Sequence, residues 1–189
     1  MNDETKNDLN RCRAFTGHRP NKFPWKYDEK DERCVELKAV LAQQIEKLAA
    51  DGMVHFYSGM ALGVDTWAAM AVLSLREKNP AIKLHCVLPC EGQESKWAVP
   101  AQMSYKMILD GADSVEYVSR VYHKKCMLDR NQRLVDCAAV LLAVYNGEKR
   151  GGTAATIRYA QKAGREIIYI LPDTRQVIRW KPAPDPEHT

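Results

Sequence analysis

The chain has 189 residues, 46% of them hydrophobic and 28% charged, which is enough for one domain with a full core and short for two. No uncharged apolar run approaches the roughly 18–20 residues that span a bilayer, and the polar N-terminus lacks the apolar stretch of a signal peptide, so we expect a cytoplasmic protein with no membrane partner. The formal net charge of +4 is mild and acidic and basic residues interleave, which permits an anionic ligand but argues against nucleic acid as a partner.

Strands and helices are predicted to alternate along residues 11–172, flanked by a disordered leader at 1–10 and a tail at 173–189. The predicted strands are 11–16, 53–57, 82–88, 114–118, 138–145 and 166–171. The predicted helices are 32–50, one that follows the motif at 58–65 and ends near 78, 99–109, 127–137 and 154–163. This alternation predicts one α/β domain with a Rossmann-like, doubly wound, mostly parallel sheet and helices on both faces.

Glycine-containing turns follow three of the predicted strands, at residues 17–20, 58–65 and 147–153. Right-handed crossovers bring the carboxyl ends of parallel strands to one edge of the sheet. Ligands of open α/β sheets bind outside that edge, where glycine lets the backbone approach an anion and a helix N-terminus adds its dipole. The three turns together therefore predict one ligand crevice, although a single turn is explained equally well by tight packing.

Most candidate residues of this crevice also have a structural interpretation. Arg19 is either a ligand contact or a solvated surface arginine, and Arg130 is either a bidentate fork on a phosphate or carboxylate or a surface salt-bridge partner. Asp65 is interpreted as a helix cap in preference to a ribose ligand, and Thr153 as either an N-cap or a phosphate contact. The predicted ligand-binding residues are Gly17, His18, Arg19, Ser58, Gly59, Gly63, Asp65, Arg130, Asn131, Gly151, Gly152 and Thr153.

Other residue types narrow the class of site. Trp25, Trp97 and Tyr145 are candidates for stacking on a base, although each aromatic side chain taken singly is more often packing. The six cysteines form no C-x-x-C pair, so we expect reduced, buried thiols and assign no metal site. Walker A and G-x-G-x-x-G patterns are both absent and no nucleophilic triad is evident, so no catalytic residue is assigned.

Taken in order, the motifs resemble the YpsA-like branch of the SLOG superfamily, which is related to DprA and to the LOG (Lonely guy) proteins. The motifs that carry the resemblance are 16–20 (TGHRP), 58–65 (SGMALGVD), Pro89, Gln93 and Trp97, Arg130-Asn131 with Val135-Asp136, and 151–153 (GGT). The resemblance covers residues 11–171. It implies a Rossmann-like fold with a nucleotide or nucleotide-derived ligand at the glycine motifs.

The LOG enzymes pair the arginine of a Met-x-x-Arg segment with a glutamate shortly after a glycine-rich turn. Residues 127–130 (MLDR) resemble that segment, but residues 154–156 (AAT) after the 151–153 turn carry no carboxylate. The missing carboxylate argues against LOG-like phosphoribohydrolase activity and leaves open whether the protein is an enzyme. The residues that we consider as substitutes are Glu91, Glu94 and Asp65.

Three functions remain open. The leading hypothesis is a SLOG-type protein that binds a nucleotide or nucleotide derivative of unknown identity and acts as a sensor or regulator. The first alternative is a hydrolase that cleaves an N-glycosidic or phosphate bond of a nucleotide. The second is an interaction protein with a vestigial crevice. A homo-oligomer is compatible with all three, whereas DNA handling of the DprA type is disfavoured by the mild charge and the lack of an added DNA-binding module.

Overall fold

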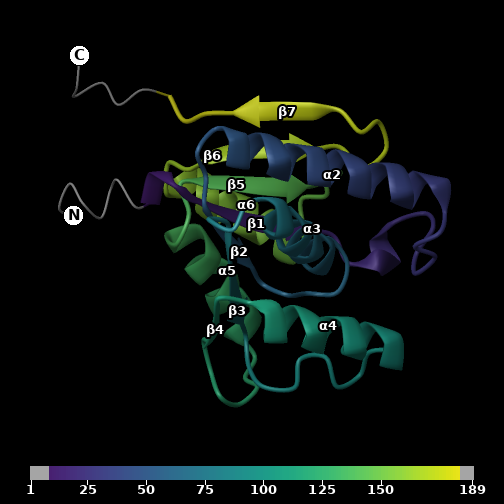
Figure 1. Cartoon of the computed structure of the whole chain (residues 1–189). Coiled ribbons are helices and arrows are strands. Elements are labelled where there is room, and N and C mark those ends of the chain that lie inside the picture. Colours follow the sequence, from purple (N-terminus) through teal and green to yellow (C-terminus); the bar gives the residue numbers. More distant parts are fainter. Residues whose placement is uncertain (1–8, 184–189) are drawn as a thin grey trace.

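A seven-stranded sheet runs through the centre of the computed structural model, which describes residues 9–183 (Figure 1). The strands are β1 (Cys12–Gly17), β2 (His55–Ser58), β3 (Lys83–Leu88), β4 (Ser114–Tyr117), β5 (Val140–Val144), β6 (Glu166–Ile170) and β7 (Val177–Trp180). Their order is β4-β3-β2-β1-β5-β6-β7, and all neighbours are parallel except β6 and β7. Strands β2, β3 and β4 therefore lie in sequence order on one side of β1, and β5, β6 and β7 lie in sequence order on the other.

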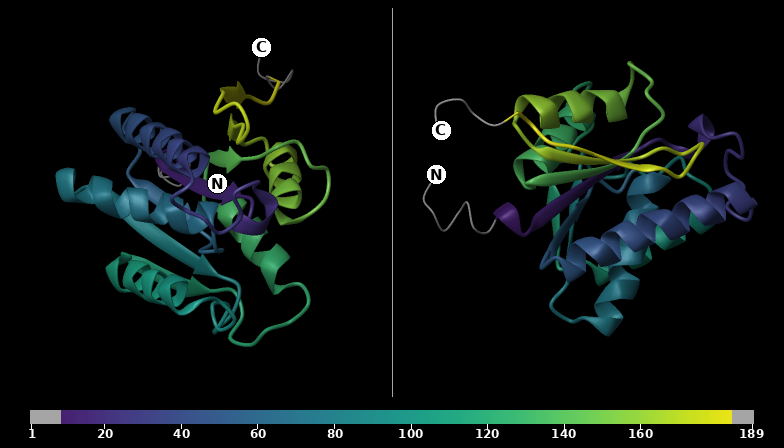
Figure 2. Two further views of the ribbon diagram at one scale, coloured as in Figure 1. Left: turned by 90° about the vertical axis from the view of Figure 1, so that its right-hand side faces the viewer. Right: turned by 90° about the horizontal axis from the view of Figure 1, so that it is seen from above.

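Helices cover both faces of the sheet, as predicted (Figure 2). One face carries α2 (Glu32–Ala50), α3 (Val64–Lys78) and α4 (Val99–Gly111), and the other carries α5 (Cys126–Asp136) and α6 (Gly152–Lys162). A short 3-10 helix, η1 (Pro20–Lys22), follows β1. Within residues 9–183 there is no helix with the length and apolar character needed to cross a membrane.

The central position of β5 follows from its sequence. All five of its residues, Val-Leu-Leu-Ala-Val, are buried. Leu142 belongs to the hydrophobic cluster beneath α2 and α3, whereas Leu141 and Ala143 belong to the cluster beneath α5 and α6. Because alternate side chains enter opposite cores, a strand with no polar position is stable only in the middle of a two-sided sheet.

The seventh strand is a correction to the prediction of six. Strand β7 lies inside the segment 173–189 that was predicted as a tail, and it pairs antiparallel with β6, Ile170 opposite Val177 and Ile167 opposite Trp180. Val177 and Ile178 are exposed, so this strand lacks the buried alternation on which strand prediction depends. Residues 1–8 of the predicted leader and 184–189 of the predicted tail lie outside the described residues, and residues 9 and 10 are helical.

Candidate functional site

A cavity of about 410 Å³ lies at the edge where β1 and β5 end, the edge that faces the viewer in the left view of Figure 2. The two strands are neighbours, with Gly17 opposite Val144, and the strand order reverses between them. Open α/β sheets bind ligands at such a reversal because the loops there diverge to opposite faces. Nine of the twelve predicted residues line this cavity: Gly17, His18, Arg19, Asp65, Arg130, Asn131, Gly151, Gly152 and Thr153.

The other three predicted residues, Ser58, Gly59 and Gly63, do not line the cavity. Ser58 is fully buried, and its hydroxyl accepts a hydrogen bond from the Met60 N–H (3.1 Å) and donates one to the Asp65 carbonyl (2.8 Å). With both interactions made inside the turn, this hydroxyl is not offered to a ligand. Its role is to hold the turn between β2 and α3 in shape.

Gly59 and Gly63 are required by close packing. A Cβ at Gly59 would overlap the Arg130 guanidinium. Gly63 has φ +102°, and a Cβ there would lie 2.9 Å from Pro20 Cδ and 3.0 Å from the His18 carbonyl oxygen. These glycines therefore bring the β2–α3 turn against α5 on one side and against the loop after β1 on the other.

Asp65 and Arg130 form a buried ion pair in the cavity wall. Arg130 Nη1 lies 3.4 Å from Asp65 Oδ2 and also donates to the Gly59 carbonyl, and the two residues are each 5% exposed. Burial raises the pKa of Asp65 while Arg130 opposes that rise, and burial lowers the pKa of Arg130 while Asp65 opposes that fall. Each ion thus depends on the other to remain charged away from water.

This pair corrects two interpretations. Asp65 is not the cap of α3, because the N-cap is Gly63 and the Thr66 hydroxyl accepts the Gly63 N–H (3.2 Å). The Asp65 carboxylate instead accepts the Ala61 N–H (3.3 Å) and faces Arg130. Arg130, in turn, is not a surface salt-bridge partner. It lies inside the protein and is positioned by a residue 65 positions away in the sequence.

The N-terminus of α6 forms the opposite wall. Its N-cap is Gly151, with φ +99°, and no described side chain caps the helix by a hydrogen bond. The Thr153 hydroxyl donates to the Gly17 carbonyl (2.9 Å), so Thr153 is neither the N-cap nor a free donor for a phosphate. Asn131 Nδ2 donates to the Gly152 carbonyl at 3.4 Å. These two contacts fix α6 beside β1 and α5, with its positive dipole end at the cavity.

The loop after β1 presents two side chains with different surroundings. His18 is buried: its Nε2 lies 2.7 Å from Asn146 Oδ1 and its ring stacks on Tyr145. Burial lowers the pKa of His18, and the contact with Asn146 partly opposes this. The Arg19 side chain is exposed and makes no hydrogen bond or ion pair with another described residue; only its backbone carbonyl is engaged, by the Lys22 N–H at 3.0 Å. Arg19 is therefore the more available of the two for a ligand.

Eight lining residues lay outside the predicted set: Thr16, Asn21, Lys22, Ala61, Met127, Leu128, Glu148 and Arg150. Lys22 of η1 and Glu148 of the loop before α6 form an ion pair (2.8 Å) that joins the two loops, and both side chains are well exposed. Lys22 and Arg150 could have been found by counting cations near the glycine turns. Together with Arg19 and Arg130 they give the cavity four cationic side chains against the carboxylates of Asp65 and Glu148.

The predicted base-stacking residues do not line this cavity. Trp25 is buried and stacks on Phe23 with ring centroids 4.9 Å apart, and the Tyr145 hydroxyl donates to the Glu148 carbonyl (2.6 Å). Trp97 packs edge-to-face on Tyr105. The cavity described so far therefore offers positive charge and backbone N–H groups, without an aromatic platform among the described residues.

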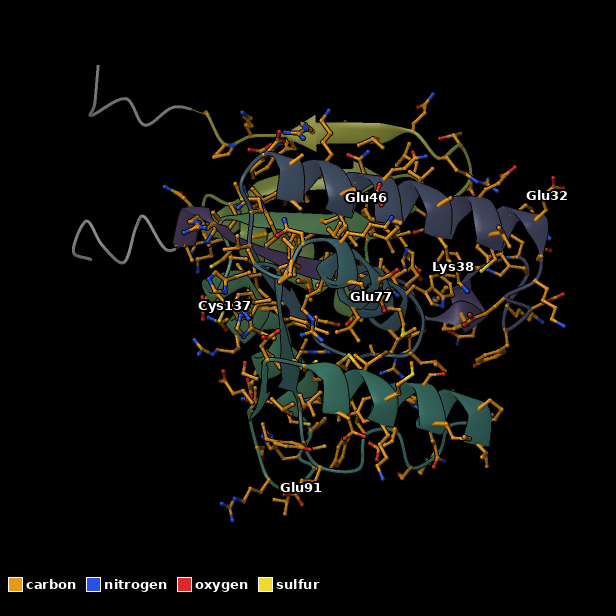
Figure 3. All side chains as sticks on the ribbon, in the orientation of Figure 1. Glu32, Lys38, Glu46, Glu77, Glu91 and Cys137 are labelled. Carbon is orange, nitrogen blue, oxygen red and sulfur yellow. The ribbon has the colours of Figure 1, made fainter. Side chains whose placement is uncertain are left out.

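Of the substitute carboxylates considered, only Asp65 reaches the cavity. Glu91 is exposed at the periphery, on the loop after β3 (Figure 3), and Glu94 lies in a different cavity beside α4. None of the six cysteines forms a disulfide within residues 9–183; five of them are buried and Cys137 is half-buried. Across residues 9–183, no three His, Cys, Asp or Glu side chains are arranged to hold a metal ion.

Sequence comparison relates this chain to bacterial proteins. The model of the YspA SLOG family matches residues 13–173. The UPF0398 protein of Halalkalibacterium halodurans is 32% identical over 137 residues, which cover 71% of this chain and 72% of that protein. The SPbeta prophage-derived protein YoqJ of Bacillus subtilis is 30% identical over 159 residues, which cover 76% of this chain and 92% of YoqJ.

Structural comparison finds the same fold in DNA processing protein A (DprA). The Streptococcus pneumoniae protein aligns with a TM-score of 0.57 at 18% identity, over 84% of this chain, which spans half of that protein. The Helicobacter pylori protein, described by its single-stranded DNA binding mode, aligns with a TM-score of 0.56 at 18% identity, over 89% of this chain and 68% of DprA. This likeness confirms the Rossmann-like fold.

The Helicobacter pylori comparison also corrects the expectation against nucleic acid as a partner, because a protein of this fold is described by its binding of single-stranded DNA. Net charge was the wrong quantity on which to base that expectation. Four cations gather at one cavity of a chain whose overall charge is only +4, and it is the local field that attracts a polyanion.

Proposed function

This chain belongs to the YspA SLOG family, and from that premise we propose that the cavity between β1 and β5 binds the phosphate-bearing part of a nucleotide or nucleotide derivative. One observation carries the proposal. The buried guanidinium of Arg130 and the N-terminus of α6, which no described side chain caps, line the same cavity of about 410 Å³. Its volume is within the range of small-molecule sites.

The hydrogen-bonding state of Arg130 supports an anion as the ligand. Its Nη1 is engaged by Gly59 and Asp65, whereas Nη2 has no hydrogen-bond partner within residues 9–183. Asp65 offsets part of the charge and leaves the second arm of the fork for a phosphate oxygen. The first N–H groups of α6 and the exposed Arg19 and Arg150 add further donors on the other sides of the cavity.

The proposed role is recognition, as in a sensor or regulator, in preference to hydrolysis. Each lining carboxylate has an ion-pair partner, Asp65 with Arg130 and Glu148 with Lys22. A hydrolase that protonates a departing base needs a carboxyl group free to hold and release a proton. These pairings support a site that holds charge in fixed positions.

Thermal-shift screening tests the proposal with mononucleotides, NAD, ADP-ribose and cyclic nucleotides. We expect at least one phosphate-bearing ligand to raise the Tm of the native protein and not that of Arg130→Met. The matched control is Arg133→Met, which removes an exposed arginine from the same helix. If no ligand raises the Tm, or if Arg130→Met responds as the native protein does, the proposal fails. Release of free base from any ligand would favour the hydrolase alternative.

Single-stranded nucleic acid is a second candidate, favoured by the fold shared with the Helicobacter pylori DprA. Each unit of a strand carries the phosphate that this cavity is proposed to hold, and three of the lining cations, Arg19, Lys22 and Arg150, are exposed. Fluorescence anisotropy with a labelled oligonucleotide at several salt concentrations tests it. The expected result is an affinity that falls steeply as salt rises, and no binding even at low salt excludes it.

A further inference from the structure

A second groove, of about 600 Å³, lies next to the cavity between β1 and β5. It runs between the loop after β1, the β2–α3 turn and the start of α4. Tyr27, Leu62, Trp97 and Pro100 give it an aromatic and apolar lining, and Lys96 contributes a cation. Tyr27 is 65% exposed, so its ring is accessible at the surface.

Consecutive residues separate this groove from the cavity. Arg19 and Ala61 line the cavity, whereas their chain neighbours Pro20 and Leu62 line the groove. Neighbouring Cα atoms are about 3.8 Å apart, so the two openings share a ridge one residue wide. The ridge is closely packed because Gly63 lies against Pro20, where a Cβ would come within 2.9 Å of the ring.

The two openings have complementary chemistry. The cavity has cations and a helix N-terminus but no Phe, Tyr or Trp among its lining residues, and the His18 ring is buried and stacks on Tyr145. The groove has aromatic and apolar surface. Its one carboxylate, Glu29, is ion-paired with Lys38. A mononucleotide held by its phosphate in the cavity finds only the buried His18 ring there, which already stacks on Tyr145, whereas a strand crossing the ridge meets the exposed ring of Tyr27.

We propose that one phosphate of a single-stranded oligonucleotide occupies the cavity between β1 and β5, and that the base of an adjacent nucleotide, across the ridge, enters the groove. This inference rests on the second candidate of the proposed function. Tyr27 stacks on the base, because every base has a flat face and such stacking tolerates any sequence. Lys96, exposed at the groove, faces the backbone on the far side of the ridge. Continuity with the cationic cavity, together with this charge, favours an oligonucleotide over an apolar peptide as the occupant.

The test compares Tyr27→Ala with Tyr122→Ala, which removes a tyrosine of similar exposure (71%) that lines neither opening. Anisotropy is measured with a 5′-phosphorylated, 3′-labelled octathymidylate, and thermal shift with thymidine 5′-monophosphate. Tyr27→Ala should weaken octamer binding by roughly 5- to 150-fold, the range for losing one stacked base. Tyr122→Ala should leave it unchanged. The mononucleotide shift should be the same in all three proteins.

The outcomes separate this inference from the proposed function. If the mononucleotide binds and Tyr27→Ala binds the octamer as the native protein does, the groove proposal is overturned and the phosphate site stands. If neither ligand binds, the groove proposal falls, and the phosphate site falls with it only if the wider thermal-shift panel also shows no binding. If the molecular mass in solution rises with protein concentration, and Tyr27→Ala reduces that rise, the groove binds a second copy of the chain. This result also overturns the proposal. Lys96→Ala should lower the salt dependence of octamer binding, and Lys124→Ala should not.

Discussion

Replacing Asp65 with asparagine removes the negative charge beside Arg130 and keeps the shape of the side chain. The amide oxygen can still accept the Ala61 N–H that the carboxylate accepts at 3.3 Å. What is lost is the 3.4 Å ion pair, which leaves a 5% exposed guanidinium with the Gly59 carbonyl as its remaining hydrogen-bond partner among the described residues. The loss of stability in Asp65→Asn therefore measures the cost of leaving the buried Arg130 charge without its carboxylate partner.

The expected cost is about 3 kcal/mol, at the lower end of the roughly 3–5 kcal/mol for breaking a buried pair, because Gly59 continues to accept a hydrogen bond. For a protein of this size each kcal/mol lowers the Tm by about 2–4 °C, so the Tm should fall by roughly 6–12 °C. Asp65→Asn should also bind phosphate-bearing ligands more tightly, because Arg130 is freed from its internal anion.

Urea denaturation of Asp65→Asn, Arg130→Met and the double variant measures the coupling directly. We expect the double variant to be more stable than the sum of the single effects predicts, by at least about 1 kcal/mol, because it leaves no unpaired ion. Asp129→Asn, an exposed carboxylate one residue from Arg130, serves as the control and should change stability little. Single effects that add within about 0.5 kcal/mol would refute the ion-pair reasoning.

Three further predictions concern the elements around the cavity. Burial lowers the pKa of His18 below its ordinary value of 6.5, so the unfolded chain takes up the proton first and the stability of the native protein should fall as the pH drops through 6.5. Between about pH 7.5 and about pH 5.5 the Tm of His18→Gln should therefore fall less than the Tm of the native protein. An equal fall in the two proteins would contradict this reasoning. Thr153→Val leaves the Gly17 carbonyl without its donor and should cost about 1 kcal/mol in urea denaturation, whereas Thr153→Ser should restore most of it. Removing residues 173–189 should lower the Tm, because it deletes β7 and its antiparallel pairing with β6. An unchanged Tm would show that β7 adds no stability.

The fold was largely predictable because its signals are local. The uninterrupted apolar run of β5 and the glycine and proline residues that end each element indicate a two-sided parallel sheet, and the structure has one. Strand β7 was missed because Val177 and Ile178 are exposed and their pairing depends on β6, which local patterning does not report. The same topology brought nine predicted residues to one cavity, since every parallel strand ends at the same edge.

The individual roles were harder to predict because they depend on contacts between distant segments. Nothing near Gly59 in the sequence indicates that Arg130, 71 positions away, lies against it. Likewise, the Thr153 hydroxyl is occupied by Gly17, 136 positions away. Tyr145 is an aromatic residue of the kind that can stack on a base, but its ring already stacks on His18. Long-range packing therefore decided which candidate groups remain available to a ligand.

The central claim is that the cavity between β1 and β5 recognises a phosphate through Arg130 and the N-terminus of α6. Isothermal titration calorimetry of the native protein and Arg130→Met tests it most directly, with a ligand found by thermal shift and the same ligand stripped of its phosphate. We predict that only the phosphorylated form binds the native protein, and that Arg130→Met binds it at least tenfold more weakly, the loss of about 1.4 kcal/mol. Equal affinity for the two forms, or for the two proteins, would contradict the account.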